Sequence, residues 1–333
     1  MKFSLIICTY MREESLHKLL LSVNKQNLYP NEILVIDGST NDNTKNLVAA
    51  TLLKNLKYFK VEEKDRGLTK QRNFGINLVA ENSEVVCFLD DDTELEVDYF
   101  KQVIETFIKD DKVIGVGGVS VNENRWFKPK KISKLNKKKF YIIDGFAVKE
   151  GLRNVVRNYL GLNSRLLPGV MPEFSNGRTN GYPLNNKIYK VDLLIGMSFS
   201  FRKTLFNKIK FSTYFEGYGL YEDADFSLRA LNYGKNVINT SAKINHYHDA
   251  SGRPNKYKYG KMVIRNGWYV WRVKYPKPKL KARIKWNAIA FLLTLIRFAN
   301  IINTNKKREA FTEGLGRVVG WFSLFFNRPK VQS

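Results

Sequence analysis

Residues 84–92 read Glu84-Val85-Val86-Cys87-Phe88-Leu89-Asp90-Asp91-Asp92, an apolar run that ends in three consecutive carboxylates. The β-branched and aromatic residues of this run predict a buried strand, which would ordinarily end in a Gly or Asn turn. Three adjacent negative charges are tolerated where a divalent cation binds two of them, and Mg²⁺ or Mn²⁺ shared with substrate phosphates is the usual arrangement. The alternative is a solvated acidic turn, so the rest of the chain has to decide between the two.

The composition predicts a globular protein with two subdomains. The chain has 333 residues, of which 44% are hydrophobic, enough for one large core or two smaller ones. Its two cysteines, Cys8 and Cys87, each lie in an apolar run, so we expect no disulfide framework and a reducing compartment. The apolar stretch of residues 1–10 is too short for a secretion signal and reads as a first strand.

The positive charge is concentrated at the C-terminal end. The net charge is +25, and residues 251–333 contain 19 Lys and Arg against only Glu309 and Glu313. A basic segment of this kind can bind nucleic acid, an anionic membrane surface or an acidic polymer. The choice among them depends on the residues that accompany the charge.

The first 115 residues alternate between strand and helix patterns. We expect strands at residues 5–9, 32–37, 57–62 and 84–89, and helices at 14–25, 69–80 and 97–109. This alternation predicts an α/β fold with a mostly parallel, Rossmann-like sheet that binds ligands at the carboxyl ends of its strands. Thr9, Asp37 and Asp90 to Asp92 all stand at such ends, so we expect them to converge on one site.

The phosphate-binding glycine loops of other α/β proteins are missing from this sequence. No G-x-G-x-x-G follows the first strand and no G-x-x-x-x-G-K-S/T occurs, which disfavours dinucleotide and Walker-type sites. A nucleotide could instead be held by Asp37, whose carboxylate accepts from a base N–H, with a metal binding the diphosphate.

Four motifs together resemble family 2 glycosyltransferases. They are Thr9-Tyr10 after the first strand, residues 35–42 (VIDGSTND), residues 66–75 (RGLTKQRNFG) and residues 88–92 (FLDDD). The resemblance covers roughly residues 3–250, and it implies a nucleotide-sugar-dependent inverting enzyme with the GT-A fold. The sequence departs from the family where Gly38 follows Asp37 directly, since a second Asp is common there.

The resemblance implies roles for individual residues. Nucleotide-sugar contacts are expected from Thr9, Tyr10, Asp37, Arg72, Asp90 and Asp91. Asp92, with Asp90, would bind the Mg²⁺ or Mn²⁺ ion that bridges the diphosphate. A phosphatase of the haloacid dehalogenase type also uses D-x-D, but on its first strand, whereas here three βα units precede the motif.

A second acidic motif lies at Glu222-Asp223. The apolar pattern that follows predicts a helix ending at Gly234, with both carboxylates in its first turn, where the helix dipole alone would favour them. An inverting transferase also needs a carboxylate to deprotonate the acceptor hydroxyl. The resemblance assigns Asp223 as this base and Glu222 to orienting or contacting the acceptor.

Two of the three histidines, His246 and His248, follow a predicted strand. A neutral imidazole there can complete the coordination of a carboxylate-bound metal or touch the diphosphate. His246 better matches the family position, His248 is the alternative ligand, and a plain polar turn is the third interpretation.

The C-terminal quarter interleaves basic and aromatic residues. Residues 286–302 are apolar except for four positions, but 17 residues fall short of the about 20 that a spanning helix needs, and Arg297 lies near their middle. We therefore expect a helix lying in the headgroup region of an anionic membrane, with residues 318–326 as a second contact. Packing onto the protein and a membrane-spanning helix are the alternatives.

We therefore divide the chain into a nucleotide-sugar-binding half (1–118), a variable basic loop or lid (119–190), an acceptor-binding half (191–250) and a basic helical extension (251–333). The predicted protein is a metal-dependent inverting glycosyltransferase, peripheral on the cytoplasmic face of the cell membrane, that acts on a glycan or lipid-linked acceptor in surface-polysaccharide synthesis. No nucleic-acid partner is expected. The rival prediction, a nucleic-acid-binding protein that uses the basic aromatic end, leaves the ordered acidic motifs unexplained.

Overall fold

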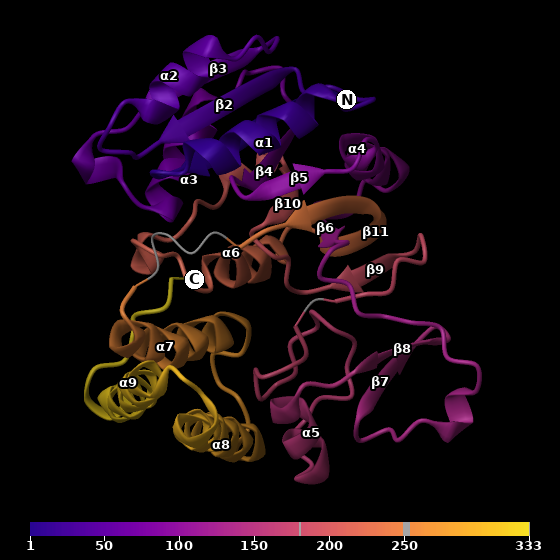
Figure 1. The fold of residues 1–333 in the computed structure, drawn as a ribbon, viewed down its shortest axis with the longest axis vertical. Helices are drawn as coiled ribbons and strands as arrows, with labels where there is room; N and C mark the ends of the chain where they lie inside the picture. The colour runs from indigo at the N-terminus through magenta and orange to yellow at the C-terminus, as the bar shows by residue number, and fades with distance from the viewer. Residues whose placement is uncertain (180, 249–253, 333) are drawn as a thin grey trace. The chain divides into compact units, whose positions relative to one another are not determined.

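The computed structural model describes residues 1–179, 181–248 and 254–332, and Figure 1 shows its fold. The chain forms two compact units, and each unit is discontinuous in sequence. Unit 1 consists of Met1–Asn124 and Leu184–Arg253, and unit 2 consists of Arg125–Pro183 and Pro254–Ser333. All the motifs named above up to His248 belong to unit 1.

Unit 1 is an α/β unit, as its alternating pattern predicts. Its strands are β1 (Phe3–Thr9), β2 (Glu32–Asp37), β3 (Leu56–Lys60), β4 (Val85–Asp90), β5 (Thr93–Leu95), β6 (Val113–Ser120), β9 (Ile188–Val191), β10 (Ser198–Arg202) and β11 (Lys235–His246). Its α-helices are α1 (Glu13–Asn24), α2 (Asn43–Ala50), α3 (Leu68–Leu78), α4 (Tyr99–Lys109) and α6 (Glu222–Ala230). Each strand and helix expected in the first 115 residues occurs, with ends that differ by a few residues.

The strands of unit 1 form one mixed sheet in the order β3-β2-β1-β4-β10-β6-β11-β5, with β9 paired to β11. The neighbours from β3 to β4 are parallel, as predicted. Beyond β4 the sheet is mixed, because β10 runs antiparallel between β4 and β6. Strand β11 pairs with three others and shifts register between Ile238 and Lys243, which lets it follow the curl of the sheet.

Helices cover both faces of the parallel half, which explains why its strands read as continuous apolar runs. On β1, Phe3, Leu5 and Ile7 pack in the same core cluster as the apolar faces of α1 and α4. Ile6 points to the opposite face, where helix α3 approaches so closely that a Cβ on Gly75 would lie 2.9 Å from it. The resulting rigid sheet fixes where its strand ends lie.

Helix α6 ends at Ala230, four residues before the Gly234 that the sequence pattern suggested. Residues 231–234 instead form the turn into β11. A Cβ on Gly234 would lie 2.7 Å from the backbone oxygen of Lys112, so the glycine allows a close approach of two backbones and does not cap the helix.

Unit 2 contains the hairpin β7 (Phe140–Ile143) and β8 (Phe146–Lys149) and the helices α5 (Leu152–Tyr159), α7 (Lys256–Lys274), α8 (Leu280–Asn303) and α9 (Lys307–Phe326). Trp271 of α7 stacks on Trp286 of α8 at 5.2 Å between ring centroids, and its indole N–H donates to the Glu173 carbonyl. The bond to Glu173 joins the two chain segments that make up the unit.

Helices α7 and α9 cross with their backbones in close approach. A Cβ added at Gly316 would overlap the backbone oxygen of Tyr257, and one at Gly260 would overlap that of Glu313. Glycine at both positions is therefore required by the packing of the two helices.

The length argument against a membrane-spanning helix is wrong. Helix α8 begins six residues before the apolar stretch at residues 286–302, so residues 280–302 form a segment of 23 residues with mean hydropathy 1.3. Among the described residues this is the one helix long and apolar enough to cross a membrane, and 22% of its apolar window is buried. Length and composition alone also fit a helix that packs on protein or lies on a membrane surface.

Candidate active site

The carboxyl ends of β1, β2 and β4 lie side by side at one edge of the sheet. In the parallel register Thr9 is opposite Asp37, and Cys8 is opposite Asp90, the last residue of β4. Asp91 and Asp92 form the turn between β4 and β5. The sheet therefore brings together the strand-end residues that the sequence pattern selected.

Asp91 is buried and bonded within the protein. Its Oδ2 accepts from the Thr9 hydroxyl at 2.7 Å, and its Oδ1 lies 3.1 Å from an Arg12 guanidinium nitrogen. Burial raises the pKa of Asp91 to about 7, although Arg12 and Thr9 act in the opposite direction. This network joins β1 to the acidic turn, and contact of Thr9 and Asp91 with a nucleotide stays a prediction.

Asp37 is fully buried with both oxygens engaged. The Ser39 amide donates to Oδ1 and the Tyr58 hydroxyl donates to Oδ2, each at 2.8 Å. Burial and the bond to Asp37 raise the pKa of Tyr58, which keeps the phenol protonated as a donor. Tyr10, by contrast, is 46% exposed. Roles for Asp37 and Tyr10 in donor binding stay predictions.

Asp90, Asp92 and His246 form a cluster that fits a divalent metal. One ligand atom from each lies within 4.8 Å of the others, and His246 Nε2 is 3.3 Å from Asp92 Oδ1. Two carboxylates with one imidazole are a donor set that suits Mn²⁺ or Mg²⁺. The pairing of β11 with β5, which sets His246 opposite Thr93, places His246 and not His248 in this cluster.

Arg72 links this cluster to the second acidic motif. Its side chain is only 2% exposed, one guanidinium nitrogen lies 3.3 Å from Asp90 Oδ1, and the other forms a short ion pair with Glu222. The guanidinium also lies over the Phe199 ring at 4.7 Å. Arg72 is thus held between carboxylates of β4 and α6, and its contact with a nucleotide stays a prediction.

Glu222 and Asp223 occupy the first turn of α6, as the sequence indicates. Burial raises the pKa of Glu222 to about 8 in spite of Arg72, and its Oε2 has no hydrogen-bond partner among the described residues. Asp223 Oδ2 accepts from the Gly196 amide at 3.0 Å, and Oδ1 accepts from the Ala224 amide at 2.7 Å. Burial raises the pKa of Asp223 more than these bonds lower it. A carboxylate with a raised pKa is suited to accept a proton.

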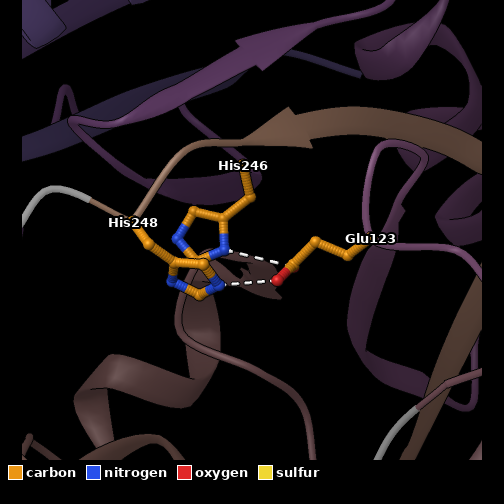
Figure 2. Close-up of side chains that lie close together, drawn as sticks. All are labelled: Glu123, His246 and His248. Carbon is orange, nitrogen blue, oxygen red and sulfur yellow. Dashed lines mark hydrogen bonds and ion pairs between the residues drawn. The ribbon is translucent and has the colours of Figure 1, made fainter. Parts of the chain in front are cut away.

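Sequence reasoning missed three residues that support the site. Arg12 contacts Asp91 and Asp92, and the Gln71 side-chain amide donates to the carbonyls of Thr9 and Ile36, at 3.1 and 2.8 Å, which ties the ends of β1 and β2 together. Glu123 lies beside His246 and His248, as Figure 2 shows. Arg12 follows Thr9 closely in sequence and Gln71 lies in the 66–75 motif beside Arg72, signals that could have been used, but Glu123 carries none.

Comparisons with known proteins show which proteins this chain resembles. Residues 4–167 match the family described as glycosyl transferase family 2. A GalNAc(5)-diNAcBac-PP-undecaprenol beta-1,3-glucosyltransferase of Campylobacter jejuni is 35% identical over 97 residues, which are 28% of this chain and 30% of that protein. An O-antigen chain rhamnosyltransferase of Salmonella typhimurium is 32% identical over 108 residues, 32% of this chain and 33% of that protein. The matches span about a third of each relative.

Solved structures show the same fold. A mannosyltransferase from Pyrobaculum calidifontis, in complex with GDP-Man and Mn²⁺, has a TM-score of 0.57 at 13% identity and covers 98% of this chain and 88% of that one. GalNAc-T7 with UDP, GalNAc and Mn²⁺ has a TM-score of 0.55 at 16% identity, covering 89% and 58%. The fold of this chain is therefore the GT-A fold of these structures. Over residues 4–167 this chain is similar to glycosyl transferase family 2, and both relatives described above are named as glycosyltransferases.

Proposed function

We propose that this protein is an inverting glycosyltransferase that moves a sugar from a nucleoside-diphosphate sugar to a hydroxyl of a glycan or lipid-linked acceptor. The observation that carries the proposal is the Arg72 bridge. It joins Asp90, in a cluster that fits a divalent metal, to Glu222, the neighbour of the candidate base Asp223. The candidate metal cluster and the candidate acceptor contact are thus linked by one chain of ion pairs in unit 1.

Asp90, Asp92 and His246 would hold Mg²⁺ or Mn²⁺, which when bound would stabilise the charge that develops on the departing diphosphate. Neighbouring side chains hold these carboxylates. Asp90 is fixed by Arg72, and Asp92 faces Arg12 and His246. The protein therefore presents a preorganised anionic set.

Asp223 is the proposed general base. It takes the proton of the acceptor hydroxyl as the acceptor oxygen forms a bond to the anomeric carbon, and the bond from that carbon to the diphosphate breaks at the same time. Attack opposite the leaving group inverts the anomeric configuration. Gly196 and Ala224 hold Asp223 in place through their amides, so little reorganisation is needed.

Glu222 is the proposed acceptor contact. Its Oε1 is engaged by Arg72, which fixes the carboxyl group, while Oε2 lacks a partner among the described residues. We propose that this buried oxygen, which is unsatisfied among the described residues, bonds an acceptor hydroxyl and directs it toward Asp223. The ion pair with Arg72 thereby orients Glu222 as well as Asp90.

The acceptor class and location are proposed from the relatives and from unit 2. The two curated relatives are named for work on an undecaprenol-linked glycan and on an O-antigen chain, so we propose a lipid-linked or surface-polysaccharide acceptor at the cytoplasmic face of the membrane. Exposed apolar side chains recur along α8 and α9. They are Leu280, Ile284, Phe291, Leu295 and Ile302 on α8, and Phe311, Leu315, Phe322, Phe325 and Phe326 on α9. With the basic residues around them, these stripes fit an anionic membrane surface.

Thermal unfolding tests the donor proposal without knowledge of the acceptor. We expect one of UDP, GDP or dTDP to raise the Tm of the full chain in the presence of Mn²⁺ or Mg²⁺, and EDTA to abolish the increase, because a ligand of the folded state stabilises it by mass action. Lack of any response to the three diphosphates, together with stabilisation by oligonucleotides, would overturn the proposal in favour of nucleic-acid binding.

A further inference from the structure

A second cluster of metal-ligating side chains adjoins the proposed donor-metal site. Glu123, His246 and His248 converge from the loop after β6 and from the end of β11 (Figure 2). His248 Nε2 lies 2.6 Å from Glu123 Oε1, and His246 Nδ1 lies 3.5 Å from Glu123 Oε2. Of the chain's three histidines, two are therefore grouped around one carboxylate.

The backbone around the cluster is held firmly. The Asn122 side chain bonds both the amide and the carbonyl of His246, at 3.0 and 2.8 Å, and the Val121 amide donates to the Ile244 carbonyl at 2.8 Å. These bonds fix the loop that carries Glu123 against the end of β11. Such support from neighbouring residues is what a metal site requires to keep its ligands in place.

One nitrogen of His246 remains to be explained. Nδ1 is buried and has no hydrogen-bond partner within the described part of the chain, since its 3.5 Å approach to Glu123 is too long for one. That separation is close to the about 3.3 Å between two ligand atoms on a tetrahedral Zn²⁺. The ligand atoms of the three residues all lie within 4.8 Å of one another.

We propose that Glu123, His246 and His248 form a second cation site, which binds Zn²⁺ or a similar transition metal. Its ligands are two imidazoles and one carboxylate, whereas the first cluster offers two carboxylates and one imidazole. Imidazole-rich sets select Zn²⁺, and carboxylate-rich sets select Mg²⁺ or Mn²⁺. The chemistry of the ligands thus separates the two sites, although both use His246.

The shared ring couples the two sites. A neutral imidazole has one lone pair, and the other nitrogen carries the proton. When Nδ1 binds Zn²⁺, Nε2–H is left to donate to Asp92 Oδ1, 3.3 Å away, an arrangement in which a carboxylate orients a metal-bound histidine. His246 then cannot serve as a ligand of the first cluster. Zn²⁺ should therefore weaken Mn²⁺ binding, a consequence that rests on the proposed function.

Calorimetric titration of the metal-free full chain with Zn²⁺ alone tests the site. We expect His248→Gln and Glu123→Gln to weaken Zn²⁺ binding by on the order of 100-fold, since loss of an outer-shell partner alone costs 10–100-fold. His17→Gln, which removes the third histidine, should bind as the unsubstituted chain does. Unchanged binding in both ligand variants, or weakening by Asp92→Asn alone, would overturn the proposal.

A second measurement tests the coupling. Free Mn²⁺ is followed by its electron paramagnetic resonance signal, and we expect saturating Zn²⁺ to weaken Mn²⁺ binding by about tenfold or more, but not in His248→Gln. An equal effect of Zn²⁺ on that variant would refute the coupling. If no Mn²⁺ binds at all while the Zn²⁺ titration succeeds, the proposed donor-metal site fails and the second site stands.

Discussion

Asp223 is the residue on which the proposed chemistry depends. Its carboxylate is half-buried, bonded to two backbone amides and raised in pKa, and it lies one residue from the Arg72-bound Glu222. Asparagine has nearly the same shape and can still accept through its side-chain oxygen, but it cannot take a proton at neutral pH. An Asp223→Asn substitution therefore removes the ability to accept a proton while the packing of the side chain stays nearly the same.

Asp223→Asn is therefore expected to lower turnover by on the order of 10²–10⁴-fold, the usual contribution of a general base. Metal-dependent stabilisation by the diphosphate should persist, because Asp223 is not among the residues of the metal cluster. Steady-state rates and Tm shifts measure the two effects. Asp111→Asn, at an exposed position, is the matched control and should behave as the unsubstituted chain. Loss of diphosphate binding in the Asp223 variant would contradict the role assigned here.

Among single residues, the sequence identifies site residues that directly follow strands better than it identifies the residues that hold those strand ends together. Asp37 and the three aspartates stand where periodicity changes, so their convergence is predictable. Gln71 reaches Thr9 and Ile36 across the fold, and this contact leaves no local pattern. The sequence leaves the choice of metal ligand between His246 and His248 open because both follow the strand. The pairing of β11 with β5 brings His246 beside Asp90 and Asp92, and its role as a ligand stays a prediction.

At the level of elements, helix propensity and packing predict opposite effects on stability when Gly316 of α9 is replaced by alanine. Alanine in a helix interior is favoured over glycine by about 1 kcal/mol. A Cβ at this position, however, would overlap the Tyr257 carbonyl of α7, so the two helices would have to separate.

We expect packing to dominate, so Gly316→Ala should lower the free energy of unfolding by about 1–3 kcal/mol, the usual cost of overpacking. Urea denaturation followed by tryptophan fluorescence measures it, because Trp271 lies in α7. Leu315→Ala changes the neighbouring, 41% exposed residue and should have little effect. A more stable Gly316→Ala protein would show that α7 and α9 do not approach as closely as described.

The elements of unit 1 are largely predictable because each strand and helix has a clear period. Unit 2 is less predictable, since the described residues of 125–183 combine a short hairpin, the eight-residue helix α5 and irregular segments. The contacts that order this segment come from helices about a hundred residues later, such as the bond from Trp271 to Glu173. The length of the apolar stretch also underestimates the length of α8, because the first turns of this helix carry Lys281, Arg283 and Lys285.

On the scale of the whole molecule, the exposed apolar stripes of α8 and α9 predict membrane binding. We expect Phe291→Ser combined with Phe322→Ser to abolish sedimentation of the full chain with anionic vesicles, because both rings are more than half exposed and contribute apolar area to the contact.

Leu52→Ser is the matched control for this experiment. Leu52 is 98% exposed but lies in unit 1, so its replacement removes a similar apolar group without affecting the stripes. Vesicle binding should be kept in this variant. Full binding by the double variant, or none by the unsubstituted chain, would exclude the interfacial contact.

The position of β10 in the sheet has a consequence for synthesis on the ribosome. Strand β10 separates β4 from β6, yet its first residue, Ser198, emerges more than seventy residues after β6 is complete. Until then, β4 has one unpaired edge and β6 has neither of its two neighbours, β10 and β11, and such edges invite association with other chains. A nascent chain stalled before Ser198 should therefore depend on chaperones, although every carboxylate of the acidic turn has already been made.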